Sequence, residues 1–257
     1  MRFEPPLRRG RLIRRYKRFF ADLELEGIGE VTAHCPNTGS LRGCLVPGAP
    51  VLAHHSDDPR RRLAWTWAAV EIDGTWVGVW SARAEALVRE AIEGGELLPE
   101  LAGYPTIQTQ VAYGGGRSRI DLLLSREGDP RRIYVEVKST TMRLAPGVAA
   151  FPDAVTERGR KHLDDLRGVV LAGHRAALVL VVQRGECPRF APAEAIDPAW
   201  TAALRRAIRA GVEVYALGVR LDEHVLEASH RLTLEIDGPA RGRGEEPAQA
   251  RSGVGLA

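Results

Sequence analysis

The spacing of apolar residues changes near Trp80, and this change restricts the chain to folds with two unlike parts. Before Trp80, apolar and polar residues alternate over short runs that are separated by turns rich in glycine and proline. After Trp80, runs with helical spacing alternate with apolar runs of strand length. Period-two alternation is typical of half-buried strands, and a period of 3.6 is typical of amphipathic helices. We therefore expect an all-β domain over residues 1–80 and a mixed α/β domain over residues 81–237.

The first part predicts a set of short strands. The alternating runs are Asp22–Leu25, Val31–Cys35, Val46–Ala53, Trp65–Ile72 and Trp76–Val79. Asp73-Gly74 separates the last two runs, and such a dipeptide is a signal for a two-residue hairpin turn. Many short strands without a long helix favour a small β-barrel or a β-sandwich.

The second part predicts the order α-β-β-β-α-β, followed by α-β-β. The expected helices cover residues 83–93, 154–170 and 200–210, and the expected strands cover residues 106–113, 119–124, 132–138, 177–183, 212–221 and 231–236. The run from Ala177 to Gln183 is the apolar run of a buried strand. Alternating helices and strands of this kind are typical of layered α/β domains.

Two segments predict irregular structure. Gly114-Gly115-Gly116 lies between two expected strands and not before a helix, which indicates a turn and not a phosphate-binding loop. From Gly238 the chain is rich in glycine, proline, arginine and glutamate. Such a composition has almost nothing to bury, so we expect a disordered tail over residues 238–257.

The composition excludes several classes of protein. No stretch approaches the roughly 20 apolar residues that a membrane-spanning helix needs, so we expect no membrane association. Cys35, Cys44 and Cys187 form no CxxC pair, which argues against a disulfide scaffold. A zinc contact from His34, Cys35 and Cys44 is an alternative to small buried thiols. No secretory segment is recognisable, and we expect a cytoplasmic protein.

Residues 119–138 carry the clearest signal for chemistry. If the two expected strands form an antiparallel hairpin, its midpoint falls between Gly128 and Asp129, which are good turn residues. Asp121 then lies directly opposite Glu136, within about 5 Å. Glu136 and Lys138 are two residues apart and share a face. Two carboxylates and one ammonium group are therefore expected at one end of a sheet.

Paired carboxylates repel each other unless a cation neutralises them. A hard divalent cation such as Mg²⁺ or Mn²⁺ takes carboxylate oxygens and keeps several waters. It can polarise a phosphoryl oxygen and lower the pKa of a bound water, so this group of residues suits phosphodiester hydrolysis. The alternative is that Glu136 and Lys138 are solvated residues of a half-exposed strand. The sequence holds 33 arginines and three lysines, and a lysine retained at position 138 favours the site, because an ammonium group can take part in proton transfer.

Asp121, Glu136-Val137-Lys138 and the helix before them resemble the PD-(D/E)xK nuclease superfamily. More narrowly, residues 2–236 resemble the sugar fermentation stimulation protein family. The segments that carry this resemblance are Leu12–Phe19, Ala33–Ser40, Ser118–Asp121, Tyr134–Ser139 and Phe151–Gly159. The resemblance implies an N-terminal OB-fold-like barrel and a C-terminal restriction-endonuclease-like α-β-β-β-α-β domain. It also implies DNA binding and a role in regulating sugar (maltose) metabolism in bacteria.

By position, the resemblance implies that Asp121 and Glu136 hold the metal and that Lys138 is the motif lysine. It implies that Glu90 is the acid of the preceding helix. On a helical wheel Glu90 lies on the flank of the apolar stripe, where a solvated glutamate is an equal alternative.

The chain departs from the family pattern at the start of this helix. Trp80-Ser81 replace an Asn-Thr pair, and Glu85 replaces an Asn. The four acid and lysine positions are unaffected, and the departure concerns substrate contacts near the helix start.

Two further groups of residues predict nucleic-acid contacts. Lys161 and His162 open the second expected helix, where they can bind phosphate or form a solvated first turn. Phe151-Pro152-Asp153 before this helix is either a loop over the site or a helix entry capped by Asp153. The basic and aromatic residues near the N-terminus suit phosphate neutralisation and base stacking, unless their aromatic rings face the core. These residues are Arg14, Arg15, Tyr16, Lys17 and Arg18.

Three hypotheses follow. The first is a DNA-binding protein with a Mg²⁺-dependent nuclease site, the second is a DNA-binding regulator that cuts nothing, and the third is RNA or nucleotide processing. The complete set of acids with Lys138 favours the first hypothesis, and DNA is the expected partner ahead of RNA.

Overall fold

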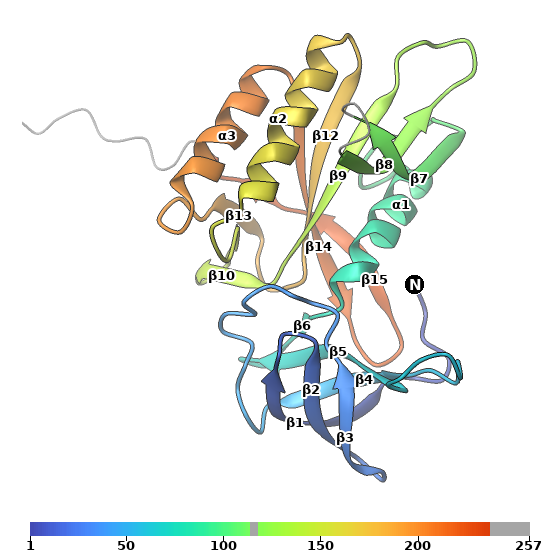
Figure 1. Cartoon of the computed structure of the whole chain (residues 1–257), viewed down its shortest axis with the longest axis vertical. Coiled ribbons are helices and arrows are strands. Elements are labelled where there is room, and N and C mark those ends of the chain that lie inside the picture. The colour runs from blue at the N-terminus through green and yellow to red at the C-terminus, as the bar shows by residue number, and fades with distance from the viewer. Residues whose placement is uncertain (114–117, 237–257) are drawn as a thin grey trace, which may run out of the picture.

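The computed structural model places a barrel beside a larger α/β part, and the two meet near Trp80 (Figure 1). The structure describes residues 1–113 and 118–236. The predicted glycine turn at residues 114–116 and the predicted tail over residues 238–257 lie outside the described residues. None of the helices in the described ranges is long and apolar enough to cross a membrane.

Five strands of the described N-terminal part close into a barrel, because β3 pairs with β5 as well as with β2. The strands are β1 (Arg8–Tyr16), β2 (Phe20–Leu25), β3 (Gly29–His34), β4 (Pro50–His55) and β5 (Trp65–Ile72). A further strand, β6 (Thr75–Gly78), extends the sheet beyond β5. The expected barrel is confirmed, and closure rules out the open sandwich that the strand pattern also allowed.

Two tight turns shape the barrel. Asp73 and Gly74 both have positive φ, at 52° and 76°, as the predicted two-residue hairpin requires. Lys17 and Arg18 have the same geometry, with φ of 46° and 62°, so β1 and β2 also form a hairpin. The basic and aromatic segment is therefore a strand end and a turn and not one continuous strand.

The α/β part contains a mixed sheet in the order β15-β14-β12-β9-β8-β7. Its strands are β7 (Thr106–Tyr113), β8 (Ser118–Ser125), β9 (Ile133–Thr140), β12 (Arg175–Val182), β14 (Glu213–Leu221) and β15 (Leu226–Arg231). β12 runs parallel to β9 and β14, and the outer pairs are antiparallel. The predicted buried strand is β12, in which every residue after Arg175 is buried.

Helices cover both faces of this sheet (Figure 1). They are α1 (Ala84–Gly94), which follows the short 3₁₀ helix η1 (Ser81–Arg83), α2 (Glu157–Leu171) and α3 (Pro198–Arg209). α1 packs on one face against Val135 and Val179, whereas α2 and α3 pack on the other face against Leu178 and Leu180. Alternate residues of β9 therefore face different helices, so Glu136 and Lys138 lie on the α2 side.

Several short strands escaped the sequence analysis. They are β10 (Met142–Ala145), β11 (Val148–Phe151) and β13 (Arg189–Pro192), and they pair with β16 (Thr233–Leu234) in the order β10-β11-β13-β16. Each has at most four residues, which is too short to show a period. The expected strand over residues 231–236 is confirmed only in part, because it contains β16 and the last residue of β15. The rest of β15, over residues 226–230, was not predicted.

The two parts share a hydrophobic core and a backbone contact. Leu52 and Ala69 of the barrel belong to the same buried cluster as Leu87 of α1. Gly78 at the end of β6 donates its N–H to the carbonyl oxygen of Gln183, at 3.0 Å. A Cβ atom on Gly78 would lie 2.3 Å from Gln183 Oε1, so a larger residue here would have to displace the Gln183 side chain at the junction.

Candidate functional site

Asp121 of β8 and Glu136 of β9 lie opposite each other in the central hairpin of the α/β sheet. The register that pairs Leu122 with Val135 places Asp121 opposite Glu136, as the sequence predicts. The N–H of Val137 donates to Asp121 Oδ2 at 2.7 Å, which fixes the Asp121 carboxylate against β9. The hairpin thus brings the two predicted metal ligands together.

Glu136 is the most deeply buried acid of this site, with 2% of its surface exposed. Its Oε1 atom receives Lys138 Nζ and contacts His162 Nδ1 of α2. Because a carboxylate only accepts hydrogen bonds, His162 Nδ1 carries the proton in this contact. Glu136 Oε2 is also buried, and it has no hydrogen-bond partner among the described residues. One oxygen of Glu136 is thus satisfied by the protein, whereas the other remains available to a ligand.

The two carboxyl groups differ in their electrostatic surroundings. Burial and the nearby charge of Glu136 raise the pKa of Asp121 above its usual value. Burial also opposes ionisation of Glu136, but the hydrogen bond from His162 and the charge of Lys138 outweigh it and lower the pKa of Glu136. The site therefore favours the charged form of Glu136 and penalises a second negative charge on Asp121, which is the situation that a bound cation would relieve.

Gln110 and Glu85 join this cluster, although the sequence analysis assigned neither a role there. Gln110 Nε2 donates to Asp121 Oδ1 at 3.1 Å and to Glu85 Oε2 at 2.5 Å. Gln110 lies within β7 but has a φ of 54°, which is uncommon for a residue other than glycine. Glu85 was visible in the sequence only as a departure from the family pattern, and an isolated Gln in an alternating strand carries no signal.

The structure does not bring Glu90 into this cluster. Glu90 is about half exposed, and its carboxylate accepts from the N-terminal ammonium group of Met1 at 3.2 Å. At about 100° per residue, Glu90 lies about 140° around α1 from Glu85. The position of α1 on the sheet turns Glu85 toward Asp121, so the placement of Glu90 at the site is corrected. The acid of α1 that reaches the cluster is Glu85.

The predicted phosphate contacts on α2 are already engaged. Lys161 Nζ donates to Ser118 Oγ at 2.5 Å and to Asp165 Oδ2 at 2.6 Å. His162 is buried against Glu136 and is a neighbour of the carboxylates and not a free surface group. The helix is capped by Thr156, whose hydroxyl accepts from the N–H of Gly159, and not by Asp153.

The site opens into two adjoining cavities of about 540 and 440 Å³. Asp121, Val137 and Lys138 line both of them. The first cavity also contains Glu136 and His162 and extends toward α2. The second is bounded by the barrel segment 37–39, by the start of α1 and by the loop before α2. The site therefore continues from the α/β part to the junction with the barrel.

The predicted basic residues of the barrel have unequal surroundings. Arg14 Nε donates to Asp22 Oδ2 at 2.8 Å, and the Tyr16 hydroxyl contacts Asp22 Oδ1 at 3.2 Å. Arg15 is directed inward to backbone carbonyl groups. Lys17 and Arg18 are exposed in the turn after β1. The segment is thus not one uniform binding surface.

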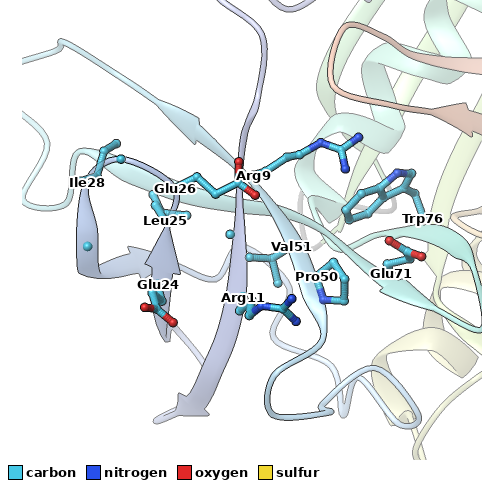
Figure 2. A pocket seen from close by; sticks show the side chains of 13 residues that line it. Arg9, Arg11, Glu24, Leu25, Glu26, Ile28, Pro50, Val51, Glu71 and Trp76 are labelled. Carbon is cyan, nitrogen blue, oxygen red and sulfur yellow. The ribbon is translucent and has the colours of Figure 1, made fainter.

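A further cavity, of about 640 Å³, lies elsewhere on the barrel. Figure 2 shows that Arg9, Trp76 and Glu71 surround it, together with Glu24 and Glu26. None of the predicted site residues lines this cavity. Its walls combine acidic and basic side chains, so it has no charge of one sign to select a ligand.

The chain forms a closed five-stranded barrel followed by an α/β domain. This domain carries an acid pair and a lysine on neighbouring strands, and these features define the class of protein. The protein combines an OB domain with a domain of the restriction-endonuclease type. Two family models match it, the SfsA N-terminal OB domain over residues 13–79 and the sugar fermentation stimulation protein RE domain over residues 82–225. The chain belongs to the sugar fermentation stimulation protein family.

Relatives from bacteria match most of the chain. A sugar fermentation stimulation protein homolog from Thioalkalivibrio sulfidiphilus is 52% identical over 86% of this chain and 92% of its own length. The homolog from Geobacter sulfurreducens is 49% identical over 88% of this chain and 95% of its own length. A solved structure, described as Pyrococcus furiosus SfsA in complex with Ca²⁺, matches with a TM-score of 0.80. It is 27% identical and covers 91% of this chain and 98% of the other chain.

Proposed function

We propose that this protein is a divalent-cation-dependent nuclease that hydrolyses phosphodiester bonds in nucleic acid, with DNA as the expected substrate. The observation that carries the proposal is the acid pair of half-buried Asp121 and buried Glu136, with Lys138 beside Glu136 and with Glu136 Oε2 unpartnered among the described residues. A buried carboxylate oxygen without a partner is costly, so its presence indicates a group that binds there.

The oxygen atoms at the site fit a hard divalent cation such as Mg²⁺ or Mn²⁺. Asp121 and Glu136 would hold the ion. Within the described residues no group of three His, Cys, Asp or Glu side chains could hold a metal alone. Water and substrate oxygens would therefore complete the coordination shell, as Mg²⁺ commonly requires. The Ca²⁺ complex of the Pyrococcus furiosus relative supports the binding of a hard cation in this fold.

The neighbouring side chains suit the rest of the reaction. When bound, the cation would polarise a phosphoryl oxygen and lower the pKa of a coordinated water. Lys138 would position the attacking water and stabilise negative charge that develops on the phosphoryl group. His162 would keep the Glu136 carboxylate oriented through Oε1, which leaves Oε2 for the cation. Lys17 and Arg18 would contribute phosphate contacts from the barrel.

The alternative is a DNA-binding regulator of sugar (maltose) metabolism genes that does not cut. One observation favours it: Lys138 and His162 both contact Glu136 Oε1, so the protein already neutralises this carboxylate without a metal. Under this alternative, the balanced site is a structural remnant of a nuclease.

Cleavage of end-labelled single-stranded and double-stranded DNA separates the two functions. The protein is incubated with Mg²⁺, Mn²⁺ or EDTA, alongside Asp121→Asn and the control Asp129→Asn, which changes an acid in the turn between β8 and β9. We expect cutting that requires the metal, is lost in Asp121→Asn and persists in Asp129→Asn. Tight binding without cutting in either metal would instead support the regulator.

A further inference from the structure

The turn between β1 and β2 presents two basic side chains and an aromatic ring to solvent. Lys17 and Arg18 are exposed, and Phe19 keeps 48% of its surface exposed. The other aromatic rings of this hairpin are occupied, because Tyr16 and Phe20 stack on each other with centroids 5.5 Å apart. Among the described residues, Phe19 has no ring partner of this kind, so its face is free to receive one.

Arg15 holds this turn against the barrel segment that follows β3. A single nitrogen, Arg15 Nη2, donates to the carbonyl oxygens of Arg18, Asn37 and Gly39, at 3.1, 2.8 and 3.0 Å. The N–H of Cys35 donates to the carbonyl oxygen of Phe19 at 2.7 Å. Because one guanidinium group spans both segments, the turn and the segment 37–39 have a fixed relative position.

The segment 37–39 is in turn part of the wall of the candidate site. It lines the same cavity as Asp121 and Lys138. Ser40, the next residue, donates through its N–H and its hydroxyl to Asp153 Oδ2, both at 2.7 Å. Asp153 belongs to the loop before α2 and also lines this cavity. The exposed turn, the barrel segment and the carboxylate site therefore follow one another without an intervening element.

We propose that the substrate is a single-stranded polynucleotide that crosses this turn, stacks an unpaired base on Phe19 and reaches the carboxylates along the segment 37–39. The proposal rests on the proposed nuclease function and names the substrate class of the same site. Lys17 and Arg18 neutralise the phosphates that flank the stacked base.

Stacking is the property that selects a single strand. In a duplex each base is covered on both faces by its neighbours, whereas an unpaired base offers a face to an exposed aromatic ring. Basic side chains alone would bind the phosphates of either form. An exposed phenylalanine beside two basic residues, on a turn that is tied to a wall of the site cavity, therefore favours an unpaired strand. The ring does not distinguish DNA from RNA.

Binding of fluorescein-labelled 20-mers, measured by anisotropy in EDTA, tests the route without requiring cleavage. The ligands are single-stranded DNA, single-stranded RNA and duplex DNA of the same sequence. The proteins are the natural chain, Phe19→Ala, Phe19→Trp and the control Ile28→Ala, which removes a barrel side chain of similar exposure, 47%. Thermal melting confirms that each variant folds, as expected for exposed positions.

We expect Phe19→Ala to weaken single-strand binding about fivefold or more, because stacking on one base contributes at least that much. Duplex binding should be unchanged, Phe19→Trp should keep the natural affinity, and Ile28→Ala should behave as the natural chain. A tighter complex with DNA or with RNA identifies which polymer is the ligand. Equal losses for single strand and duplex, or no loss with either, would overturn the proposal.

Cleavage assays test the nuclease function separately from the binding route. If Phe19→Ala selectively weakens single-strand binding while the natural chain cuts nothing in Mg²⁺ or Mn²⁺, the strand route stands and the nuclease proposal fails. If the natural chain cuts and Phe19→Ala cuts single-stranded and duplex DNA at natural rates, the nuclease proposal stands and the route fails.

Discussion

The acid site of the α/β part and the basic hairpin of the barrel were both predicted from residue type, but only at the acid site does the structure bring most of the predicted residues together. Asp121, Glu136 and Lys138 converge because strand register and side-chain alternation determine where they lie. In the hairpin, Asp22 engages both Arg14 and Tyr16. A basic segment therefore becomes a binding surface only where nearby acids and carbonyl groups leave its side chains unoccupied.

The largest effect in this comparison of the acid site with the basic hairpin is expected for Lys138→Ala at the acid site. Removal of the ammonium group that would position water should lower the cleavage rate by about 10²- to 10⁴-fold, the usual contribution of such a group. DNA affinity in EDTA should change little, because phosphate contacts elsewhere remain. Rates from single-turnover assays and affinities from anisotropy measure the two effects. A large loss of affinity with an unchanged rate of cutting would assign Lys138 to binding instead.

The next largest effect should distinguish the two acids of α1. Glu85 is joined to Asp121 through Gln110, so Glu85→Gln should weaken cation binding by about 10- to 100-fold, as the loss of a supporting contact commonly does. Glu90→Gln should leave cation affinity unchanged, because its carboxylate pairs with the N-terminus. Calorimetric titration with Mn²⁺ measures both variants. Weaker binding in Glu90→Gln alone would restore Glu90, the residue that the family resemblance implied.

A smaller effect is expected in the basic hairpin. Lys17→Gln and Arg18→Gln should each reduce the dependence of single-strand binding on salt by about 0.7 in log–log slope, which corresponds to one lost phosphate contact. Arg14→Gln is the matched control, because Arg14 is paired with Asp22 and should leave the slope unchanged. Affinities measured across a series of salt concentrations give the slopes. A shallower slope in the Arg14 variant would show that the pair with Asp22 opens on binding.

The smallest expected effect is the acid sensitivity of the hairpin. Burial works against ionisation of Asp22, but hydrogen bonds from Arg14, Thr32 and Tyr16 outweigh it and hold the pKa of Asp22 below its usual range. The stabilisation is thus complete above the ordinary pKa of about 3.9 and is lost as pH falls through the folded value. Unfolding midpoints of the natural chain and Asp22→Asn should therefore differ most at pH 6, and the difference should shrink progressively as the pH falls below about 4. A constant difference would show that ionisation of Asp22 does not contribute.

Most strands of the barrel and of the central sheet were predictable because their side-chain period shows directly which residues are buried, whereas β15 was missed except for its last residue. The tight turn at Asp73-Gly74 carries a local signal as well. The strands β10, β11 and β13 were not predictable, because they are short and their sheet also pairs segments far apart in the sequence. The strand β3 was predicted, but its pairing with β5, which closes the barrel, joins segments far apart in the sequence and could not be predicted from the side-chain period.

Within the site, the hairpin register could be read from the sequence, but the surrounding residues could not. Glu136 and Asp121 follow from counting residues on either side of one turn. Gln110 reaches Asp121 through an unusual backbone angle within β7, and residue type does not reveal such an angle. The choice between Glu85 and Glu90 depends on how α1 is rotated on the sheet. That rotation is set by the helix residues buried against neighbouring strands and not by the helical period alone.

The core shared by the barrel and the α/β part has a consequence for how the protein unfolds. Leu52 and Ala69 are buried in the same cluster as Leu87, and Gly78 is bonded to Gln183 across the junction. Separating the parts would expose this apolar surface, so neither part should keep its full stability alone. Calorimetry should therefore show a single cooperative transition, in which the calorimetric and van't Hoff enthalpies agree. The proposed polynucleotide route crosses both parts, so it should be lost in a single step on heating, when the barrel and the α/β part unfold together.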